Sequence, residues 1–410
     1  MLLVDNVAFE CRRCKMELTL NVFTLNCWGI PVVSKNRKER IEAIADYLSK
    51  AAHNIVCLQE VWSEKDYLYL KEHLRINLPY SHYFYSGVLG SGLCVFSKWL
   101  IQDVFFHQWP LNGYIHKIHH GDWFGGKGIG LCRIKCKDRL INVYCTHLHA
   151  EYNVDDIYLA HRVLQAYSTA EFVNLTTPPA DVSILAGDLN TAPGDITFRL
   201  ISELPSLVDP CILSRCKDEA VKPAGTCDNI NNSYSDPKLV KTCPEGKRID
   251  HILFNVHPTL EADVVNFGNP LEDRVPGKAF SYSDHNAVTL ELKIKFTEKL
   301  KQRQQSAEER FRETIDEAIQ ICKEATITLT RTKQLFLTTG TLIFIFLLGS
   351  VSFWPNNIIG DVLKIIMTGI CMYYITMGTL WNKIEMNSLK AGLSAMENFK
   401  TSRRDVKWFD

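Results

Sequence analysis

Two long apolar segments near the C-terminal end place the strongest constraint on the fold of this chain. Residues 334–354 carry no charged side chain and are long enough to cross a bilayer as a helix. Residues 358–381 form a second apolar segment, although Asp361 and Lys364 lie near its start, and a Pro-Asn-Asn turn separates the two. The sequence therefore predicts a two-helix transmembrane hairpin. The alternative is a buried apolar hairpin in a soluble protein.

Basic side chains flank both outer ends of this hairpin: Arg331, Lys333, Lys383, Lys390, Lys400, Arg403 and Arg404. By the positive-inside rule, the preceding domain and the C-terminal tail share the cytosolic side. Residues 298–333 are charged with a sparse apolar stripe and predict a connecting helix, whereas 382–410 predict a basic cytosolic tail. The first residues lack the basic region and apolar run of a secretory signal. We expect an integral protein of the endoplasmic reticulum or another internal membrane.

Charge and cysteine content restrict the partners and the compartment of the preceding domain. The 46 Lys and Arg residues balance 46 Asp and Glu residues, which argues against a broad basic face for nucleic acid. The 14 cysteines are scattered through apolar or strand-like contexts, so we expect reduced, buried thiols. Cys11 and Cys14 have the spacing of a zinc-binding pair, but no second pair follows at the required distance.

The apolar stretch 182–190 predicts a buried strand that ends abruptly in Gly187-Asp188-Leu189-Asn190. Because strand side chains alternate between faces, Asp188 and Asn190 are expected to point the same way, where they could hold a phosphate and a water together. Taken alone, the four residues favour an ordinary turn, since Gly, Asp and Asn are common turn formers. The polar residues at the ends of other predicted strands distinguish between the two interpretations.

The same pattern of an apolar or alternating strand with a polar side chain near its end recurs along the chain. The predicted strands are 18–26 with Asn26, 54–60 with Glu60, 139–149 with His147, 247–254 with Asp250, 280–287 with Asp284 and His285, and 288–294. A lone acid after a strand is usually a solvated surface group. Several such groups together are expected to converge as ligands.

Helices and loops separate these strands. Helical periodicity covers 37–52 and 157–173, and residues 205–246 predict a long irregular excursion. Alternating helices and strands predict an α/β domain over 1–297, built of two packed sheets flanked by helices. His119 and His120 are expected at a loop or rim, because adjacent side chains point to opposite sides of a strand. The Gly-Gly-Lys-Gly run at 125–128 does not match a P-loop.

Six short motifs, taken in chain order, resemble those of the endonuclease/exonuclease/phosphatase superfamily. They are Thr-Leu-Asn at 24–26, Leu-Gln-Glu at 58–60, Thr-His-Leu at 146–148, Gly-Asp-Leu-Asn at 187–190, Arg-Ile-Asp-His at 248–251 and Ser-Asp-His at 283–285. The resemblance implies a four-layer α/β sandwich and magnesium-dependent phosphoester hydrolysis, with 1–297 as the catalytic phosphodiesterase domain. His251 departs from the pattern, because many members have an aromatic residue there.

Three longer stretches are similar to the neutral sphingomyelinases with two C-terminal membrane spans. They are Thr-His-Leu-His-Ala-Glu-Tyr at 146–152, Leu-Ala-His-Arg-Val at 159–163 and His-His-Gly-Asp-Trp-Phe at 119–124. This resemblance implies a Mg²⁺-dependent phosphodiesterase that hydrolyses sphingomyelin or ceramide phosphoethanolamine to ceramide and the phosphorylated head group. The expected partner is a sphingolipid in a membrane, without nucleic acid.

The resemblance also implies roles for individual residues. Glu60 would bind the metal with Asn26 beside it, because a hard divalent cation, Mg²⁺ or as a substitute Mn²⁺, prefers oxygen ligands and neutralises phosphate charge. His285 would be the general base, since its unperturbed pKa lies near neutrality, and Asp250 would orient its imidazole. Asp188 would align the attacking water, and Asn190 would donate to a phosphate oxygen. His147 would steady the phosphate or the leaving group, and Asp284 would be a supporting acid.

Three alternatives stay open at the level of sequence. A nuclease on the same scaffold would need a basic groove and would have little use for two membrane spans. An inositol-polyphosphate 5-phosphatase is disfavoured, because 247–250 reads Lys-Arg-Ile-Asp where that group has Trp-x-Asp-Arg. An inactive membrane scaffold would tolerate loss of the polar residues at the strand ends, yet all are present.

Overall fold

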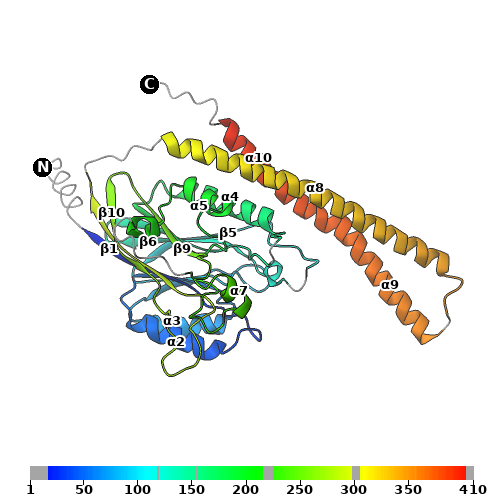
Figure 1. Ribbon diagram of the computed structural model, residues 1–410, viewed down its shortest axis with the longest axis horizontal. Helices are drawn as coiled ribbons and strands as arrows, with labels where there is room; N and C mark the ends of the chain where they lie inside the picture. The colour runs from blue at the N-terminus through cyan, green and yellow to red at the C-terminus, as the bar shows by residue number, and fades with distance from the viewer. Residues whose placement is uncertain are drawn as a thin grey trace.

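Two β-sheets packed face to face form the centre of the molecule (Figure 1). The computed structural model describes residues 17–117, 120–152, 155–215, 225–297, 305–355 and 357–402. One sheet has the strand order β10 (Leu260–Gly268), β11 (Val288–Phe296), β1 (Leu18–Asn26), β2 (Ile55–Gln59), β4 (Cys94–Ser97), β3 (Tyr80–Tyr83). The other has the order β5 (Ile101–Gln108), β6 (Gly128–Cys136), β7 (Arg139–His147), β8 (Val182–Asp188), β9 (Asp250–Val256).

Helices cover the outer faces of both sheets, so the predicted four-layer sandwich is confirmed. Helices α2 (Arg37–Lys50) and α3 (Glu64–Leu74) pack on the six-stranded sheet, and α4 (Leu159–Thr176) and α5 (Ile196–Glu203) pack on the five-stranded sheet. Both faces of the central strands are therefore buried, which explains their nearly continuous apolar sequences.

Side-chain alternation shows which residues face the space between the sheets. In β1, Leu20 and Val22 join the cluster between the sheets, whereas Phe23 and Leu25 join the cluster under α2 and α3. In β8, Ile184 and Ala186 also face the inner cluster. Because the period of a strand is two residues, the even-numbered positions of both strands point inward as far as their last residues.

Parallel pairing brings the ends of four strands to one edge of the sandwich. Strand β1 pairs in parallel with β2, and β7 pairs in parallel with β8. The carboxyl ends of parallel strands lie at the same edge. Gly187 is required near that edge, because its φ is +152° and a Cβ there would lie 2.0 Å from the Thr146 carbonyl oxygen.

The segment 280–287 is not the strand that alternation predicts; only β11 forms from the predicted pair. Polar side chains from 226–235 form hydrogen bonds with the backbone of this segment instead. The Asn232 amide donates to the Ser283 carbonyl at 2.9 Å, and the Ser281 N–H donates to the Ser233 hydroxyl at 2.8 Å. Within 205–246 the described residues are largely irregular, with two short helices, α6 (Pro210–Arg215) and α7 (Pro237–Thr242). Strands β3, β5, β6 and β10 and helices α3 and α5 had no counterpart in the sequence prediction.

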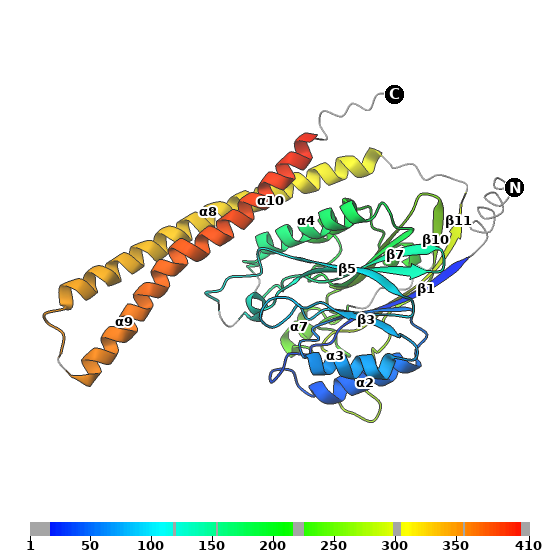
Figure 2. The same cartoon turned by 180° about the vertical axis from the view of Figure 1, so that it is seen from behind.

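Two long helical rods follow the sandwich and extend beyond it (Figures 1 and 2). The predicted connecting helix and first apolar segment form one continuous helix, α8 (Gln305–Ser350). Helix α9 (Ile358–Thr376), the π-helical turn η2 (Met377–Trp381) and α10 (Asn382–Ser402) run back beside it. Much of the predicted tail is thus helical, while Arg403, Arg404, Cys11, Cys14 and His119 lie outside the described residues.

Both rods are long and apolar enough to cross a membrane. In the most apolar 18-residue stretch of each rod, only 6% and 11% of the residues are buried in the protein. A core helix of a soluble protein would be mostly buried. The two helices therefore suggest membrane anchoring.

Candidate active site

The polar residues predicted at strand ends come together at one edge of the sandwich. Their positions are Asn26 at the end of β1, Glu60 after β2, His147 and Asp188 at the ends of β7 and β8, Asn190 after β8, Asp250 at the start of β9, and Asp284 and His285 before β11. Asp188 lies directly opposite Asp250 in the antiparallel β8–β9 pair. Topology, rather than proximity in sequence, therefore assembles the site.

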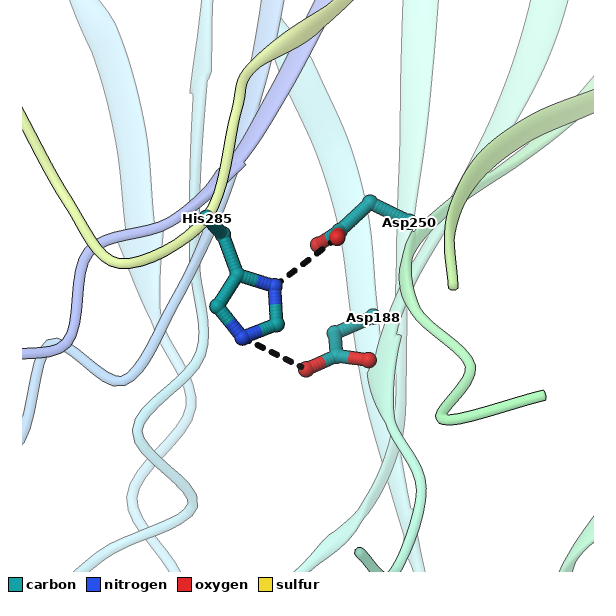
Figure 3. A group of neighbouring side chains, drawn as sticks. All are labelled: Asp188, Asp250 and His285. Atoms are coloured by element: carbon teal, nitrogen blue, oxygen red, sulfur yellow. Dashed lines mark hydrogen bonds and ion pairs between the residues drawn. The ribbon is translucent and has the colours of Figure 1, made fainter. Parts of the chain in front are cut away.

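His285, Asp250 and Asp188 form a tight group, which Figure 3 shows. His285 Nδ1 lies 2.8 Å from Asp250 Oδ2, and His285 Nε2 lies 3.9 Å from Asp188 Oδ2. The second oxygen of Asp250, Oδ1, is buried and has no hydrogen-bond partner. Since a buried carboxylate oxygen normally has a partner, this atom is suited to accept from a water or to ligate a cation.

The protonation of His285 differs from the expectation of an unperturbed imidazole. Burial acts to lower its pKa, but the charges of Asp250 and Cys227 and their hydrogen bonds raise the pKa well above the ordinary value. Asp250 thus both orients the ring and stabilises its cationic form. A nearby cation would favour the neutral form that a general base requires.

Asn26 connects Glu60 with Asp188. Its side-chain nitrogen donates to Glu60 Oε1 at 2.9 Å and to Asp188 Oδ2 at 3.0 Å. Burial and then the charge of Asp284 raise the pKa of Glu60, and burial and then Asp250 raise the pKa of Asp188 to about 7. Ionised carboxylates in this position need a positive group between them.

Glu60 enters the site through an unusual backbone conformation. By strand alternation it would face the outer side of the sheet, since Gln59 is the inward residue and contacts Cys145 of the other sheet. Its φ of +55° lies in the left-handed region and reverses that direction. Such a conformation is uncommon for a non-glycine residue and frequent at functional sites.

Asn190 does not follow the strand alternation that the sequence predicts. The strand ends at Asp188, and Asn190 has a φ of +46°, while its backbone N–H donates to Asp188 Oδ1 at 2.9 Å. Its side-chain nitrogen donates to the Leu148 carbonyl at 3.0 Å. An Asx-type turn, rather than a continuing strand, therefore places its amide.

Lys127 is a buried cation of the site that the sequence reasoning missed. Its side chain is 1% exposed, and Nζ lies 2.7 Å from Asp122 Oδ1 and 3.0 Å from the Leu148 carbonyl oxygen, to which it donates. It also lies 3.2 Å from His147 Nε2, which is 3.3 Å from Asp188 Oδ2. Burial and the charge of Lys127 hold the pKa of His147 well below its ordinary range. A single lysine just before the buried strand β6 was the available signal.

Arg40 is a second residue that sequence reasoning did not single out. On helix α2 it looks like a surface arginine, yet it is fully buried and donates to the carbonyls of Cys27 and Trp28, each at 2.7 Å. Its guanidinium also lies 4.9 Å from the centre of the Trp28 ring. These contacts hold the loop that follows Asn26. The sequence carries no signal for this role.

The donor set fits a hard divalent cation. Asp188, Asp250 and His285 offer ligand atoms that all lie within 4.8 Å of one another and form a candidate metal site. Glu60 and Asn26 adjoin it through Asp188. The Asn26 nitrogen occupies the position between two carboxylates, and oxygen donors dominate the group, as Mg²⁺ prefers.

Comparison with known proteins identifies the family. The pattern of the Endonuclease/Exonuclease/phosphatase family matches residues 23–285, a range that includes all eight predicted site residues and ends at His285. A putative neutral sphingomyelinase of Drosophila melanogaster is 34% identical over 93% of this chain and 96% of its own length. The chain belongs to the neutral sphingomyelinase branch of this family. This confirms the resemblance inferred from the motifs.

Other relatives in this family carry related names. Human sphingomyelin phosphodiesterase 2 is 41% identical over 68% of this chain and 66% of its own length. An inositol phosphosphingolipids phospholipase C of Schizosaccharomyces pombe is 35% identical over 67% and 69%. Both names describe an enzyme that cleaves a phosphodiester of a sphingolipid, and the two sphingolipids differ in head group.

Solved structures show the same fold at low identity. Sphingomyelinase C from Streptomyces griseocarneus has a TM-score of 0.50 and 18% identity, covering 67% of this chain and 99% of its own. TDP2 of D. rerio, in complex with a single-stranded DNA product, has a TM-score of 0.50 and 16% identity, covering 67% and 98%. Fold alone therefore does not separate a lipid substrate from a nucleic-acid one.

Proposed function

We propose that this chain is a membrane-anchored, Mg²⁺-dependent neutral sphingomyelin phosphodiesterase. It hydrolyses sphingomyelin or ceramide phosphoethanolamine to ceramide and the phosphorylated head group. The observation that carries the proposal is the meeting of Glu60, Asn26, Asp188, Asp250 and His285 at one sandwich edge, in a chain of the neutral sphingomyelinase branch with two long apolar helices.

His285 takes a proton from the attacking water in this proposal. Asp250 accepts from its Nδ1 at 2.8 Å, which leaves Nε2 directed toward Asp188 and available to the water. The water oxygen forms a bond to phosphorus as the bond from phosphorus to the ceramide oxygen breaks. The leaving oxygen keeps the electron pair of that bond and takes a proton from solvent.

Glu60 and Asn26 would hold the cation beside Asp188, to which Asn26 is hydrogen-bonded, so that His285 keeps Nε2 for the water rather than for the metal. The cation supplies positive charge that offsets the charge on the phosphodiester oxygens. The Asn26 amide would then present its oxygen rather than its nitrogen, since the two ends of an amide have nearly the same shape.

The opposite side of the site would hold the phosphate. Asp188 aligns the water, because its Oδ2 lies between Asn26 and His147. Asn190 has one side-chain N–H bonded to Leu148 and a second for a phosphate oxygen. Lys127 adds a buried positive charge beside His147, and the pKa of Glu60 is raised by burial and then by the charge of Asp284.

The catalytic domain is placed on the cytosolic side of the endoplasmic reticulum or another internal membrane in this proposal. The basic residues at both outer ends of the hairpin support that orientation.

A substrate panel tests the function. The full chain in detergent with Mg²⁺ is offered labelled sphingomyelin, ceramide phosphoethanolamine, inositol phosphoceramide and duplex DNA. Release of a phosphorylated head group, lost on chelation and in His285→Ala with an unchanged melting temperature, supports the proposal. Cleavage of DNA with intact lipids would refute it, and the ratio among the lipids gives the head-group preference.

A further inference from the structure

Helices α8 and α10 are docked against the catalytic domain rather than loosely tethered to it. Phe311, Ile315 and Cys322 of α8 and Met396 of α10 are buried in the same apolar cluster as α4 and α5. At Gly392 an added Cβ would lie 2.1 Å from a Leu164 methyl carbon, so α10 approaches α4 closely. The direction of the membrane hairpin is therefore fixed relative to the domain.

A segment that leads toward the active site contacts α8 near the start of the apolar segment 334–354. Residues 109–117, which precede Lys127 of the site in the chain, touch both α8 and α10. The ring of His116 lies 5.8 Å from that of Phe336, the third residue of the apolar segment 334–354, and the Ser388 hydroxyl donates to the Pro110 carbonyl at 3.4 Å. Figures 1 and 2 show that the hairpin extends past the domain on the side of α7.

Two loops at the same edge expose apolar side chains to solvent. Val32 and Val33 are 104% and 67% exposed, and Val88 and Leu89 are 90% and 55% exposed. We call these four residues the apolar rim. Isolated exposed apolar residues are ordinary on a protein surface, but two loop tips with adjacent pairs are not.

Both loops are hydrogen-bonded to the backbone at or next to Glu60 of the site. The Gly29 N–H, at the start of one loop, donates to the Glu60 carbonyl at 3.0 Å, and the Val61 N–H donates to the Gly92 carbonyl, at the end of the other, at 2.9 Å. Residues 85–92 contain no charge, and exposed Lys35 follows the first pair. Apolar tips beside a lysine fit the boundary between lipid head groups and acyl chains.

We propose that the apolar rim inserts into the head-group region of the same bilayer that the hairpin enters. The docked helices hold the site edge at the membrane boundary, and the rim residues there bury apolar surface that would otherwise face water. The inference rests on the proposed membrane anchoring and deepens the proposed lipid substrate. A sphingolipid then reaches the site without leaving the bilayer, because the rim loops that adjoin Glu60 lie among the head groups.

Photocrosslinking tests the contact without using activity. The full chain is reconstituted in phosphatidylcholine vesicles containing phosphatidylserine, with photoreactive benzoylphenylalanine at Val88 or at Ile76. Ile76 is 84% exposed and lies at the opposite edge, since α3 leads away from the site and β3 leads back to the loop of Val88. We expect a lipid adduct at Val88 and none at Ile76. No adduct at Val88, or equal adducts at both positions, would overturn the proposal.

Charge insertion provides a second, functional test. Val88→Asp should lower the ratio of activity on vesicle substrate to activity on a short-chain, water-soluble substrate about tenfold, while Ile76→Asp should keep the wild-type ratio. An unchanged ratio for Val88→Asp would argue against the rim. If the chain hydrolyses no sphingolipid at all, the proposed function fails, and the crosslinking result still decides whether the rim meets the bilayer.

Discussion

Replacing Asp188 by asparagine tests whether the site holds unfavourable charge that a cation relieves. Burial and Asp250 raise the pKa of Asp188 to about 7, roughly 3 units above that of an unfolded aspartate. A raised carboxyl pKa means that the folded state loses stability as the pH rises from about 4 to about 7. At about 1.4 kcal/mol per unit, ionised Asp188 costs on the order of 4 kcal/mol above pH 7 when no cation is bound.

Asparagine removes this charge at a small structural cost. It can still accept from the Asn190 N–H, which lies 2.9 Å from Asp188 Oδ1, but it loses the acceptor for Asn26 at 3.0 Å, which costs about 1 kcal/mol. The expected net gain for Asp188→Asn in chelator is about 3 kcal/mol at pH 8. At pH 5 it is below about 1 kcal/mol, because the folded wild-type protein then keeps the proton.

Thermal unfolding of the full chain in detergent measures the effect. We expect Asp188→Asn to melt several degrees above wild type at pH 8 with chelator, and close to wild type at pH 5. Saturating Mg²⁺ should raise the melting temperature of wild type more than that of the inactive variant. Asp138→Asn, in the exposed turn between β6 and β7, controls for loss of one negative charge. Equal gains at both pH values, or destabilisation at both, would refute the reasoning.

Three further substitutions probe the base, the metal ligand and the docking of the helices. Asp250→Asn should lower maximal activity at least a hundredfold. It should also move the acid limb of the pH–activity profile to lower pH, because Asp250 raises the pKa of His285. An unchanged acid limb would mean that a group other than His285 controls it. Glu60→Gln should raise the Mg²⁺ concentration for half-maximal activity at least tenfold, whereas an unchanged concentration would move the metal to the other carboxylates. Gly392→Val should cost about 1–3 kcal/mol by forcing α10 away from Leu164; a wild-type unfolding free energy would show that the two helices do not pack there.

Local sequence pattern was sufficient for most of the central strands. The predicted strand 18–26 coincides with β1, and the strand predicted within 182–190 corresponds to β8, which ends two residues earlier at Asp188, because alternation and apolar runs are properties of neighbouring residues. The same logic failed at 280–287, where alternation is present but side chains from 226–235 take the backbone hydrogen bonds. A pattern within one segment carries no information about a competing partner elsewhere.

The sequence by itself determined most residues of the site, although not Lys127, and the two long apolar helices. Asn26, Glu60, His147, Asp188, Asp250 and His285 could be singled out because each lies beside a strong strand pattern, and the hairpin because uncharged length is a local property. Their resemblance to known motifs indicated the chemistry.

Only the tertiary structure decided how these residues act on one another. Asn26 bonds Asp188 across 162 residues of sequence, Glu60 reaches the site through a left-handed backbone, and Lys127 is buried against His147. Burial and charge proximity set the pKa values, and both depend on contacts between distant segments. The docking of α8 and α10 on the sandwich is likewise a contact between distant parts of the chain.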